Sequence, residues 1–269
     1  HEVKLIDTTF KITDEEIKTK AKTFNPDFIA ITAATNDLDN AIRVTNLIKK
    51  VTNAKTICGG YHATVAPEDI IKHFDIVAIG EAEQSIIKLL ENPDNQNIPN
   101  LWIKTPTEII KNKLSQLNQD LDELPFADRE IFDYQKYINS NRGLATFMSS
   151  KGCPFLCSYC INKVLIDKYK GKGKFLRFRS IQNLIKEIKQ VTTKYKVKEI
   201  EFYDDTFTLN KERLKEFAEI YPKEVGLPFY INARVNAVTK EDFELLKKAG
   251  CVRVSLGIES GNPKLRNSV

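Results

Sequence analysis

Short apolar runs alternate with amphipathic helical patterns along most of the chain, and this alternation restricts the possible folds more than any other sequence feature. In the first part of the chain the expected strands cover residues 3–6, 28–32, 55–57 and 76–79. The expected helices cover residues 14–22, 38–51, 67–74 and 81–90. Apolar runs separated by helices are typical of buried parallel strands, so the sequence predicts an α/β domain here.

The chain is long enough for two domains. At 269 residues and 30.7 kDa it exceeds the usual size of a single domain. A hairpin over residues 101–104 and 108–111 closes the first domain, which we place at residues 1–112. Residues 113–143 contain Pro125 and a mixture of acidic and aromatic residues, and they are predicted to form a partly ordered linker.

The second domain, residues 144–269, contains four expected strands and the helices between them. The strands cover residues 144–149, 199–203, 229–233 and 252–258, and the helices cover residues 181–195, 211–220 and 240–249. This pattern predicts the first four β/α units of a barrel. Barrel enzymes place their chemistry in the loops at the carboxyl ends of the strands.

Composition limits the partners and the compartment. The formal net charge of +5 is modest, and lysines alternate with acidic residues along helical stretches such as 186–189, so we expect a solvated surface and no nucleic-acid partner. No run of 18 apolar residues occurs, which predicts no membrane span. The odd number of cysteines, five, and the lack of a signal-like apolar start favour the reducing cytoplasm over a disulfide framework.

Three of the cysteines, Cys153, Cys157 and Cys160, lie in one loop with the spacing Cys-x3-Cys-x2-Cys. Structural zinc normally takes four ligands in two separated pairs. The remaining candidates form no second pair: Cys58, Cys251, His62, His73 and the terminal His1. A 4Fe-4S cluster held by three cysteines leaves one iron open to a small molecule. The spacing favours such a cluster, with zinc or metal-free thiols as alternatives.

The loop resembles the radical S-adenosylmethionine (radical SAM) superfamily, whose signature Cys-x3-Cys-x-aromatic-Cys includes Tyr159 here. The resemblance continues through residues 202–207, 230–234 and 255–261. It implies that the open iron binds the amino and carboxylate groups of S-adenosylmethionine, and that the reduced cluster cleaves this cofactor to a 5'-deoxyadenosyl radical. The electron would come from a donor such as flavodoxin or ferredoxin.

Polar residues at the carboxyl ends of the expected barrel strands supply the groups that such a cofactor needs. By position, the resemblance implies Asp204 for the amino group, Arg234 for the carboxylate, Glu259 or Ser260 for the ribose and Tyr159 for the adenine. Taken singly, an acid or an arginine at a barrel rim fits an ordinary salt bridge equally well.

Residues 58–64, 77–83 and 121–129 resemble the cobalamin (B12)-binding domain, and the junction after it, that precede the barrel in one subgroup of this superfamily. This implies a flavodoxin- or Rossmann-like domain with the corrin at the carboxyl ends of its strands. The residues expected there are Thr32, Thr35, Gly59, Gly60, Gly80 and Glu81. The glycine pair also fits a simple tight turn. The chain has no Asp-x-His-x-x-Gly string, so we expect His62 to be a loop histidine and not a cobalt ligand.

The implied function is a cobalamin-dependent radical SAM methyltransferase that acts on an unactivated centre of a small-molecule substrate. Its two half-reactions need the corrin to face the cluster. A radical SAM cyclisation or rearrangement without methyl transfer is the alternative among enzymes, and a zinc- or cluster-stabilised binding module is the alternative outside them. Because family members have a further strand-helix unit upstream and at least six barrel strands, we expect additional elements on both sides of this chain.

Overall fold

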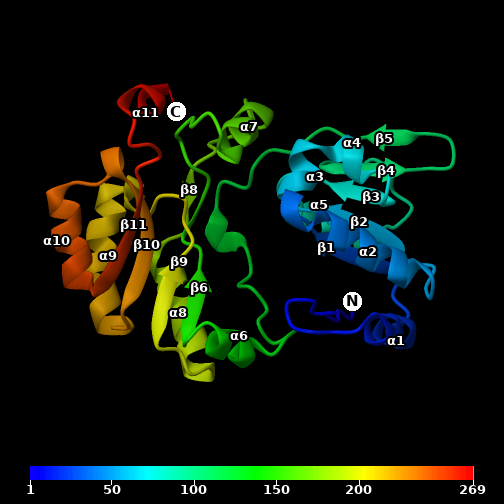
Figure 1. Cartoon of the computed structure of the whole chain (residues 1–269), viewed down its shortest axis with the longest axis horizontal. Helices are drawn as coiled ribbons and strands as arrows, with labels where there is room; N and C mark the ends of the chain where they lie inside the picture. The colour runs from blue at the N-terminus through cyan, green and yellow to red at the C-terminus, as the bar shows by residue number, and fades with distance from the viewer. Residues whose placement is uncertain (269) are drawn as a thin grey trace. The chain divides into compact units, whose positions relative to one another are not determined.

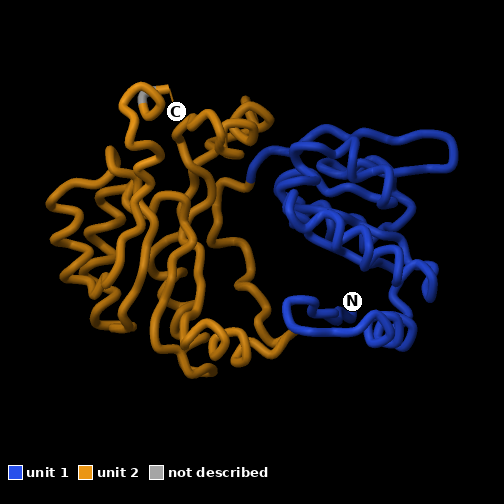
Figure 2. The backbone as a smooth tube through the Cα atoms, viewed as in Figure 1, with its two compact units in different colours: residues 1–117 blue, residues 118–269 orange. Residues whose placement is uncertain are grey.

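The computed structural model describes residues 1–268, apart from the side chain of residue 267, and divides the chain into two compact units. Unit 1 spans His1–Leu117 and unit 2 spans Asn118–Val269 (Figure 2). Most of the segment 113–143, predicted as a linker, therefore packs within unit 2. Its ordered parts are a short 3-10 helix, Leu121–Glu123, and helix α6, Tyr134–Ser140.

Unit 1 is built on a five-stranded sheet with the order β1-β2-β3-β4-β5 (Figure 1). The strands are β1 (Phe28–Thr32), β2 (Lys55–Gly59), β3 (Ile76–Ala78), β4 (Leu101–Lys104) and β5 (Ile109–Lys111). The first three are parallel, and β4 and β5 form an antiparallel hairpin at the edge next to β3. The predicted α/β fold and the predicted hairpin are both confirmed.

Helices cover both faces of this sheet. They are α1 (Asp14–Phe24), α2 (Leu38–Lys49), α3 (Tyr61–Val65), α4 (Pro67–Ile70) and α5 (Glu83–Glu91). Successive strand residues point to opposite faces. Cys58 and Val77 therefore pack with residues of α2, α3 and α4, whereas Ile57 and Ile76 pack with Leu89 of α5 on the other face.

The strand expected at residues 3–6 is wrong. The structure has no helix or strand between residues 1 and 13, and the first regular element is α1, which begins after a capping box formed by Thr13 and Glu16. Val3 and Leu5 are exposed. A strand needs a neighbour for its backbone hydrogen bonds. Residues 3–6 pair with no strand, and β1 remains the edge of the sheet, so apolar composition alone did not make this segment a strand.

Unit 2 contains a four-stranded parallel sheet with the order β11-β10-β9-β6. The strands are β6 (Leu144–Phe147), β9 (Glu199–Phe202), β10 (Phe229–Arg234) and β11 (Cys251–Gly257). The helices are α6, α7 (Ile161–Lys168), α8 (Ile181–Lys194), α9 (Lys211–Glu224), α10 (Lys240–Ala249) and α11 (Pro263–Ser268). This open sheet is the predicted first part of a β/α barrel.

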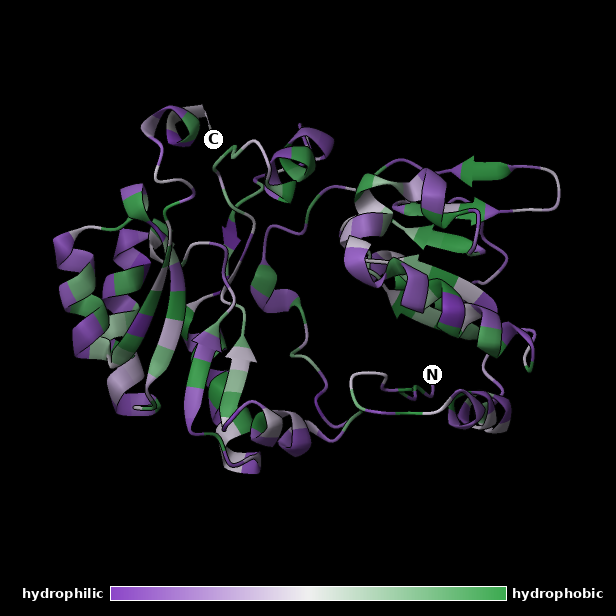
Figure 3. Cartoon of the chain, in the orientation of Figure 1, coloured by the Kyte–Doolittle hydropathy of each residue, from purple (hydrophilic) through white to green (hydrophobic). Residues whose placement is uncertain are grey.

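One face of the unit 2 sheet forms the main hydrophobic core. Alternate residues such as Phe147, Phe202 and Phe229 point into it and pack against α6, α8, α9 and α10. The helices show both apolar and polar stretches in Figure 3, as expected for helices with one buried side. The intervening strand residues, Arg234 among them, lie on the opposite face.

A search of the described helices finds none that combines the length and the apolar character needed to cross a bilayer.

Candidate cluster and cofactor site

The cysteine loop lies at the carboxyl end of the unit 2 sheet, between a two-residue strand β7 (Ser150–Lys151) and helix α7. β7 pairs with β8 (Arg177–Phe178), a ribbon that the sequence did not predict. Gly152 opens the loop with φ +87°, and a Cβ there would lie 2.6 Å from the Phe175 carbonyl oxygen. Only glycine fits this turn without displacing the backbone.

Each of the three thiols has a hydrogen-bonding partner from a different part of unit 2. The pairs are Cys153 with the Thr206 side chain, Cys157 with Arg234 and Cys160 with Asn162. Arg234 Nη1 donates to Cys157 Sγ at 2.6 Å, and Asn162 Nδ2 lies 3.7 Å from Cys160 Sγ. The segments after β9, at the end of β10 and at the start of α7 therefore meet at the cysteine loop.

Burial raises the pKa of the Cys153 thiol, while hydrogen bonds from the Phe155 backbone and the Thr206 side chain act in the opposite direction. Metal binding requires thiolates. The guanidinium group of Arg234, which also stacks over the Phe155 ring at 4.3 Å, places a positive charge beside Cys157. The donors around the loop are thus placed to hydrogen-bond the sulfur atoms that would hold a cluster.

Among the described residues, no three His, Cys, Asp or Glu side chains converge as they would around one metal ion. A 4Fe-4S cluster takes each of its cysteines on a separate iron, so its ligands stand farther apart than those of a single ion. The soft thiol donor set and the open loop fit such a cluster better than structural zinc, which binds four ligands in a closed tetrahedron.

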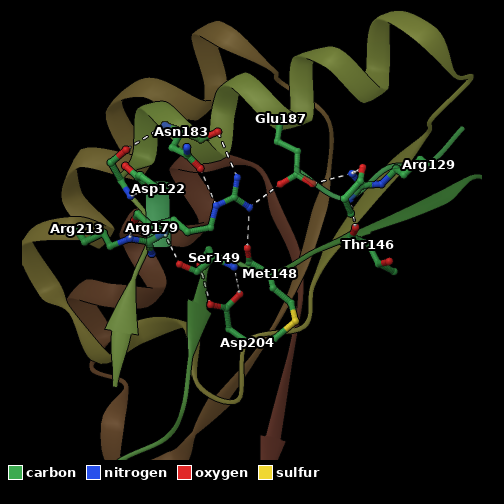
Figure 4. Close-up of polar contacts among 12 residues, drawn as sticks. Asp122, Arg129, Thr146, Met148, Ser149, Arg179, Asn183, Glu187, Asp204 and Arg213 are labelled. Carbon is green, nitrogen blue, oxygen red and sulfur yellow. Dashed lines mark hydrogen bonds and ion pairs between the residues drawn. The ribbon is translucent and has the colours of Figure 1, made fainter. Parts of the chain in front are cut away.

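Asp204 does not lie open to a ligand, so its assignment to the cofactor amino group needs correction. The residue is 1% exposed, and its carboxylate accepts hydrogen bonds from Ser149 N (3.1 Å) and Ser149 Oγ (2.7 Å), which Figure 4 shows. Ser150 Oγ donates to the same carboxylate. Burial raises its pKa, which the serine hydrogen bonds partly oppose. Asp205, the next residue, is exposed and accepts from Asn162 Nδ2 at 3.1 Å.

A buried ionic network supports the chain just before the cysteine loop (Figure 4). Glu187 of α8 accepts from Arg129 Nη1 at 2.6 Å and from Arg179 Nη1 at 2.5 Å. Arg179 Nη1 also donates to the Met148 carbonyl oxygen at 3.0 Å, and Arg129 Nη2 donates to the Thr146 carbonyl oxygen at 3.4 Å. The network thereby fixes the carboxyl end of β6, which leads through β7 into the cysteine loop.

The other sequence-predicted contacts lie around the same end of the sheet. Tyr159 is exposed in the cysteine loop, and a hydrogen bond with Glu259 raises its pKa to about 12. Glu259 follows β11 and adopts φ +67°, which residues other than glycine rarely do and which often marks functional sites. Ser260 follows it, half-buried. The structure therefore joins Tyr159 to Glu259 directly.

In unit 1 the predicted corrin-edge residues also gather at the carboxyl ends of the strands. Thr32 ends β1 and Gly59 ends β2, and the Ala33 amide donates to the Gly59 carbonyl oxygen at 3.0 Å. Thr35 Oγ1 lies 3.0 Å from His62 Nδ1. His62 is in helix α3, where the sequence predicted a loop.

Gly80 follows β3 and joins the same edge, because its amide donates to Thr64 Oγ1 at 2.9 Å. Thr64 Oγ1 in turn donates to the Gly60 carbonyl oxygen at 2.8 Å. The Glu81 carbonyl oxygen accepts from the Asn100 side chain. Backbone and threonine hydrogen bonds thus connect the loops after β1, β2 and β3, and we call this edge of the sheet the ledge of unit 1.

Replacing Gly60 by alanine is expected to destabilise unit 1 by about 1 to 3 kcal/mol through backbone strain. Gly60 has φ +99°, and a Cβ would lie 2.6 Å from Thr32 Oγ1 and 2.9 Å from the Ala33 carbonyl oxygen. Urea unfolding followed by the fluorescence of Trp102, the single tryptophan, measures unit 1 selectively. Gly59→Ala is the matched control, because its Cβ would meet Ala78 Cβ at an ordinary 3.6 Å. Equal stabilities of the two variants would contradict this account.

Comparisons with known families agree with the division of the chain into two units. Residues 148–269 match the family model of the radical SAM superfamily, and residues 1–90 match that of the B12 binding domain. The chain therefore contains a radical SAM domain over residues 148–269, and a B12-binding domain over residues 1–90 precedes it. Both resemblances seen in the sequence are confirmed.

Two curated relatives align with nearly the whole of this chain, across both of its domains. An uncharacterized methyltransferase of Pyrococcus horikoshii is 30% identical over 98% of this chain and 59% of the relative. The anaerobic magnesium-protoporphyrin IX monomethyl ester cyclase of Rubrivivax gelatinosus is 26% identical over 94% of this chain and 47% of the relative. This chain thus spans about half the length of the relatives it matches.

A solved structure shows the same fold. The radical S-adenosylmethionine methyltransferase TsrM from Kitasatospora setae, with cobalamin and a 4Fe-4S cluster bound, matches with a TM-score of 0.74. The match covers 94% of this chain and 52% of that one at 16% identity, so it supports the fold and not the residue roles.

Proposed function

We propose that this protein is a cobalamin-dependent radical SAM methyltransferase whose 4Fe-4S cluster is held by Cys153, Cys157 and Cys160. The observation that carries the proposal is the position of these thiols, at the carboxyl end of a parallel sheet, each beside a hydrogen-bond donor. A B12-binding domain in the same chain and the methyltransferase relative favour methyl transfer over other radical reactions.

When bound, the reduced cluster supplies the electron that cleaves S-adenosylmethionine, and cobalamin supplies a methyl carrier. The protein's contribution is to orient the cofactor and keep water away. Arg234 is proposed to bind the cofactor carboxylate, because its guanidinium group already lies at the loop. The exposed Asp205 replaces Asp204 as the proposed partner of the amino group.

Tyr159 is proposed to contact the adenine, and Glu259 or Ser260 the ribose. Support comes from the Tyr159–Glu259 hydrogen bond, which brings the aromatic ring and the carboxylate together. The corrin is assigned to the ledge of unit 1 formed by Thr32, Thr35, Gly59, Gly60, Gly80 and Glu81. A small-molecule substrate and an electron donor such as flavodoxin or ferredoxin complete the proposal.

A second candidate is a radical SAM reaction without methyl transfer. The similarity to an anaerobic cyclase, which matches nearly the whole of this chain, supports this candidate. The two candidates differ in what becomes of S-adenosylmethionine. Methyl transfer yields S-adenosylhomocysteine in addition to 5'-deoxyadenosine, whereas cyclisation yields 5'-deoxyadenosine alone.

The proposal is tested with anaerobically reconstituted protein, a chemical reductant and S-adenosylmethionine, with and without added cobalamin. We expect stable uptake of cobalamin, cluster-dependent 5'-deoxyadenosine, and S-adenosylhomocysteine only when cobalamin is present. Production of 5'-deoxyadenosine without cobalamin uptake would favour the second candidate. Protein that binds zinc and assembles no cluster would refute both and support a binding module.

A further inference from the structure

Asn162 is a buried polar residue beside the cysteine loop that neither the sequence patterns nor the proposed cofactor contacts use. It is the second residue of α7 and is only 6% exposed. Burial of an amide is costly unless its polar atoms are hydrogen-bonded. Its partners therefore indicate what the residue does.

The Asn162 amide nitrogen serves two acceptors that come from different strands. Nδ2 donates to Asp205 Oδ2 at 3.1 Å, and it lies 3.7 Å from Cys160 Sγ. A primary amide carries two hydrogens, so a single Asn can satisfy both acceptors. Cys160 ends the cysteine loop that follows β7, whereas Asp205 follows β9.

This bridge joins a proposed cluster ligand to the proposed partner of the cofactor amino group. Hydrogen bonds to cluster sulfurs change the reduction potential, because a donor offsets the negative charge gained on reduction. The same amide nitrogen holds the Asp205 carboxylate beside Cys160, which would bind the cluster. Both effects depend on the N–H groups, not on the volume of the side chain.

We infer that Asn162 is a positioning residue that fixes Cys160 and Asp205 relative to each other, and thereby sets both the cluster potential and the affinity for S-adenosylmethionine. The inference rests on the proposed function. It concerns a residue that acts through two others, not one that touches the reacting atoms.

Two substitutions separate the hydrogen bonds from the packing. Asn162→Ala removes the amide, and Asn162→Asp keeps the shape but replaces both N–H donors by a negative oxygen. Asn139→Ala is the control, because Asn139 is exposed on α6 and its side-chain oxygen accepts a local hydrogen bond from Gln135 of the same helix. All are studied as reconstituted protein with measured iron and sulfide contents.

The midpoint potential of the cluster, from a redox titration followed by electron paramagnetic resonance, is the main readout. We expect it to become more negative from wild type to Asn162→Ala and again to Asn162→Asp, where a negative charge is added. The dissociation constant for S-adenosylmethionine should rise about fivefold in Asn162→Ala, the effect of one net hydrogen bond, and more in Asn162→Asp. The control should match wild type in both.

Wild-type potential and affinity in Asn162→Asp would overturn the inference, whatever Asn162→Ala does. Folded Asn162→Ala protein that takes up no iron, beside a fully loaded control, would support the positioning role. Failure of wild type to assemble a 4Fe-4S cluster would instead refute the proposed function. The two failures are therefore distinguishable.

Discussion

Replacement of Cys157 by alanine is expected to abolish the 4Fe-4S cluster and, with it, cleavage of S-adenosylmethionine. Three cysteines already leave one iron without a protein ligand, so the loss of another leaves two thiolates for four irons. The lost sulfur is also the acceptor for Arg234 Nη1 at 2.6 Å, so the guanidinium group loses its anchor at the loop. Iron and sulfide analysis and the yield of 5'-deoxyadenosine measure the effect.

Cys251→Ala is the matched control for this experiment. Cys251 begins β11, at the amino end of the sheet, while the cysteine loop lies at the carboxyl end. The variant therefore removes a half-buried thiol that is not among the proposed ligands. This variant should load its cluster normally. A Cys157→Ala protein with wild-type iron and sulfide contents would remove the ligand assignment.

The parts of the site that sequence could predict are those fixed by local chain order. The cysteine spacing and the strand ends near residues 204, 234 and 259 follow from short patterns that the fold preserves. The choice between Asp204 and Asp205 as the cofactor contact cannot be made from such patterns. Both follow β9, and Asp204 is buried because Ser149 and Ser150, on a neighbouring segment, supply its donors.

Contacts between distant segments were likewise beyond the reach of sequence patterns. The contact between Asn162 and Cys160 joins residues two positions apart, which a sequence pattern can indicate. The hydrogen bond from Asn162 to Asp205 joins residues 43 positions apart, which no local pattern indicates. The sequence places Arg129 in a linker, yet in the structure it forms an ion pair with Glu187, 58 residues away. In the other direction, the apolar residues at 3–6 suggested a strand that found no partner. In each case the outcome depends on which distant segment lies beside the residue, and a local sequence pattern does not contain that information.

Replacement of Glu187 by alanine is expected to destabilise unit 2 by about 3 to 5 kcal/mol, because it leaves two largely buried guanidinium groups without their shared anion. Arg129 and Arg179 are 11% and 13% exposed in their side chains, and Glu187 is 6% exposed. Without Glu187, Arg179 loses the ion pair that orients it toward the Met148 carbonyl oxygen at the end of β6. We therefore also expect a lower yield of loaded cluster.

The location of the effect can be measured as well as its size, because Trp102, the single tryptophan, lies in unit 1. In Glu187→Ala, urea unfolding followed by far-ultraviolet circular dichroism should show an early transition from unit 2, while the tryptophan transition stays near its wild-type midpoint. Glu224→Ala is the control: its pair with Lys189, at 2.8 Å, is about half exposed, and its loss should cost less than about 1 kcal/mol. If Glu187→Ala is no less stable than Glu224→Ala, the buried network does not hold the end of β6, and the support for the cysteine loop must come from Asp204 and the serines it binds.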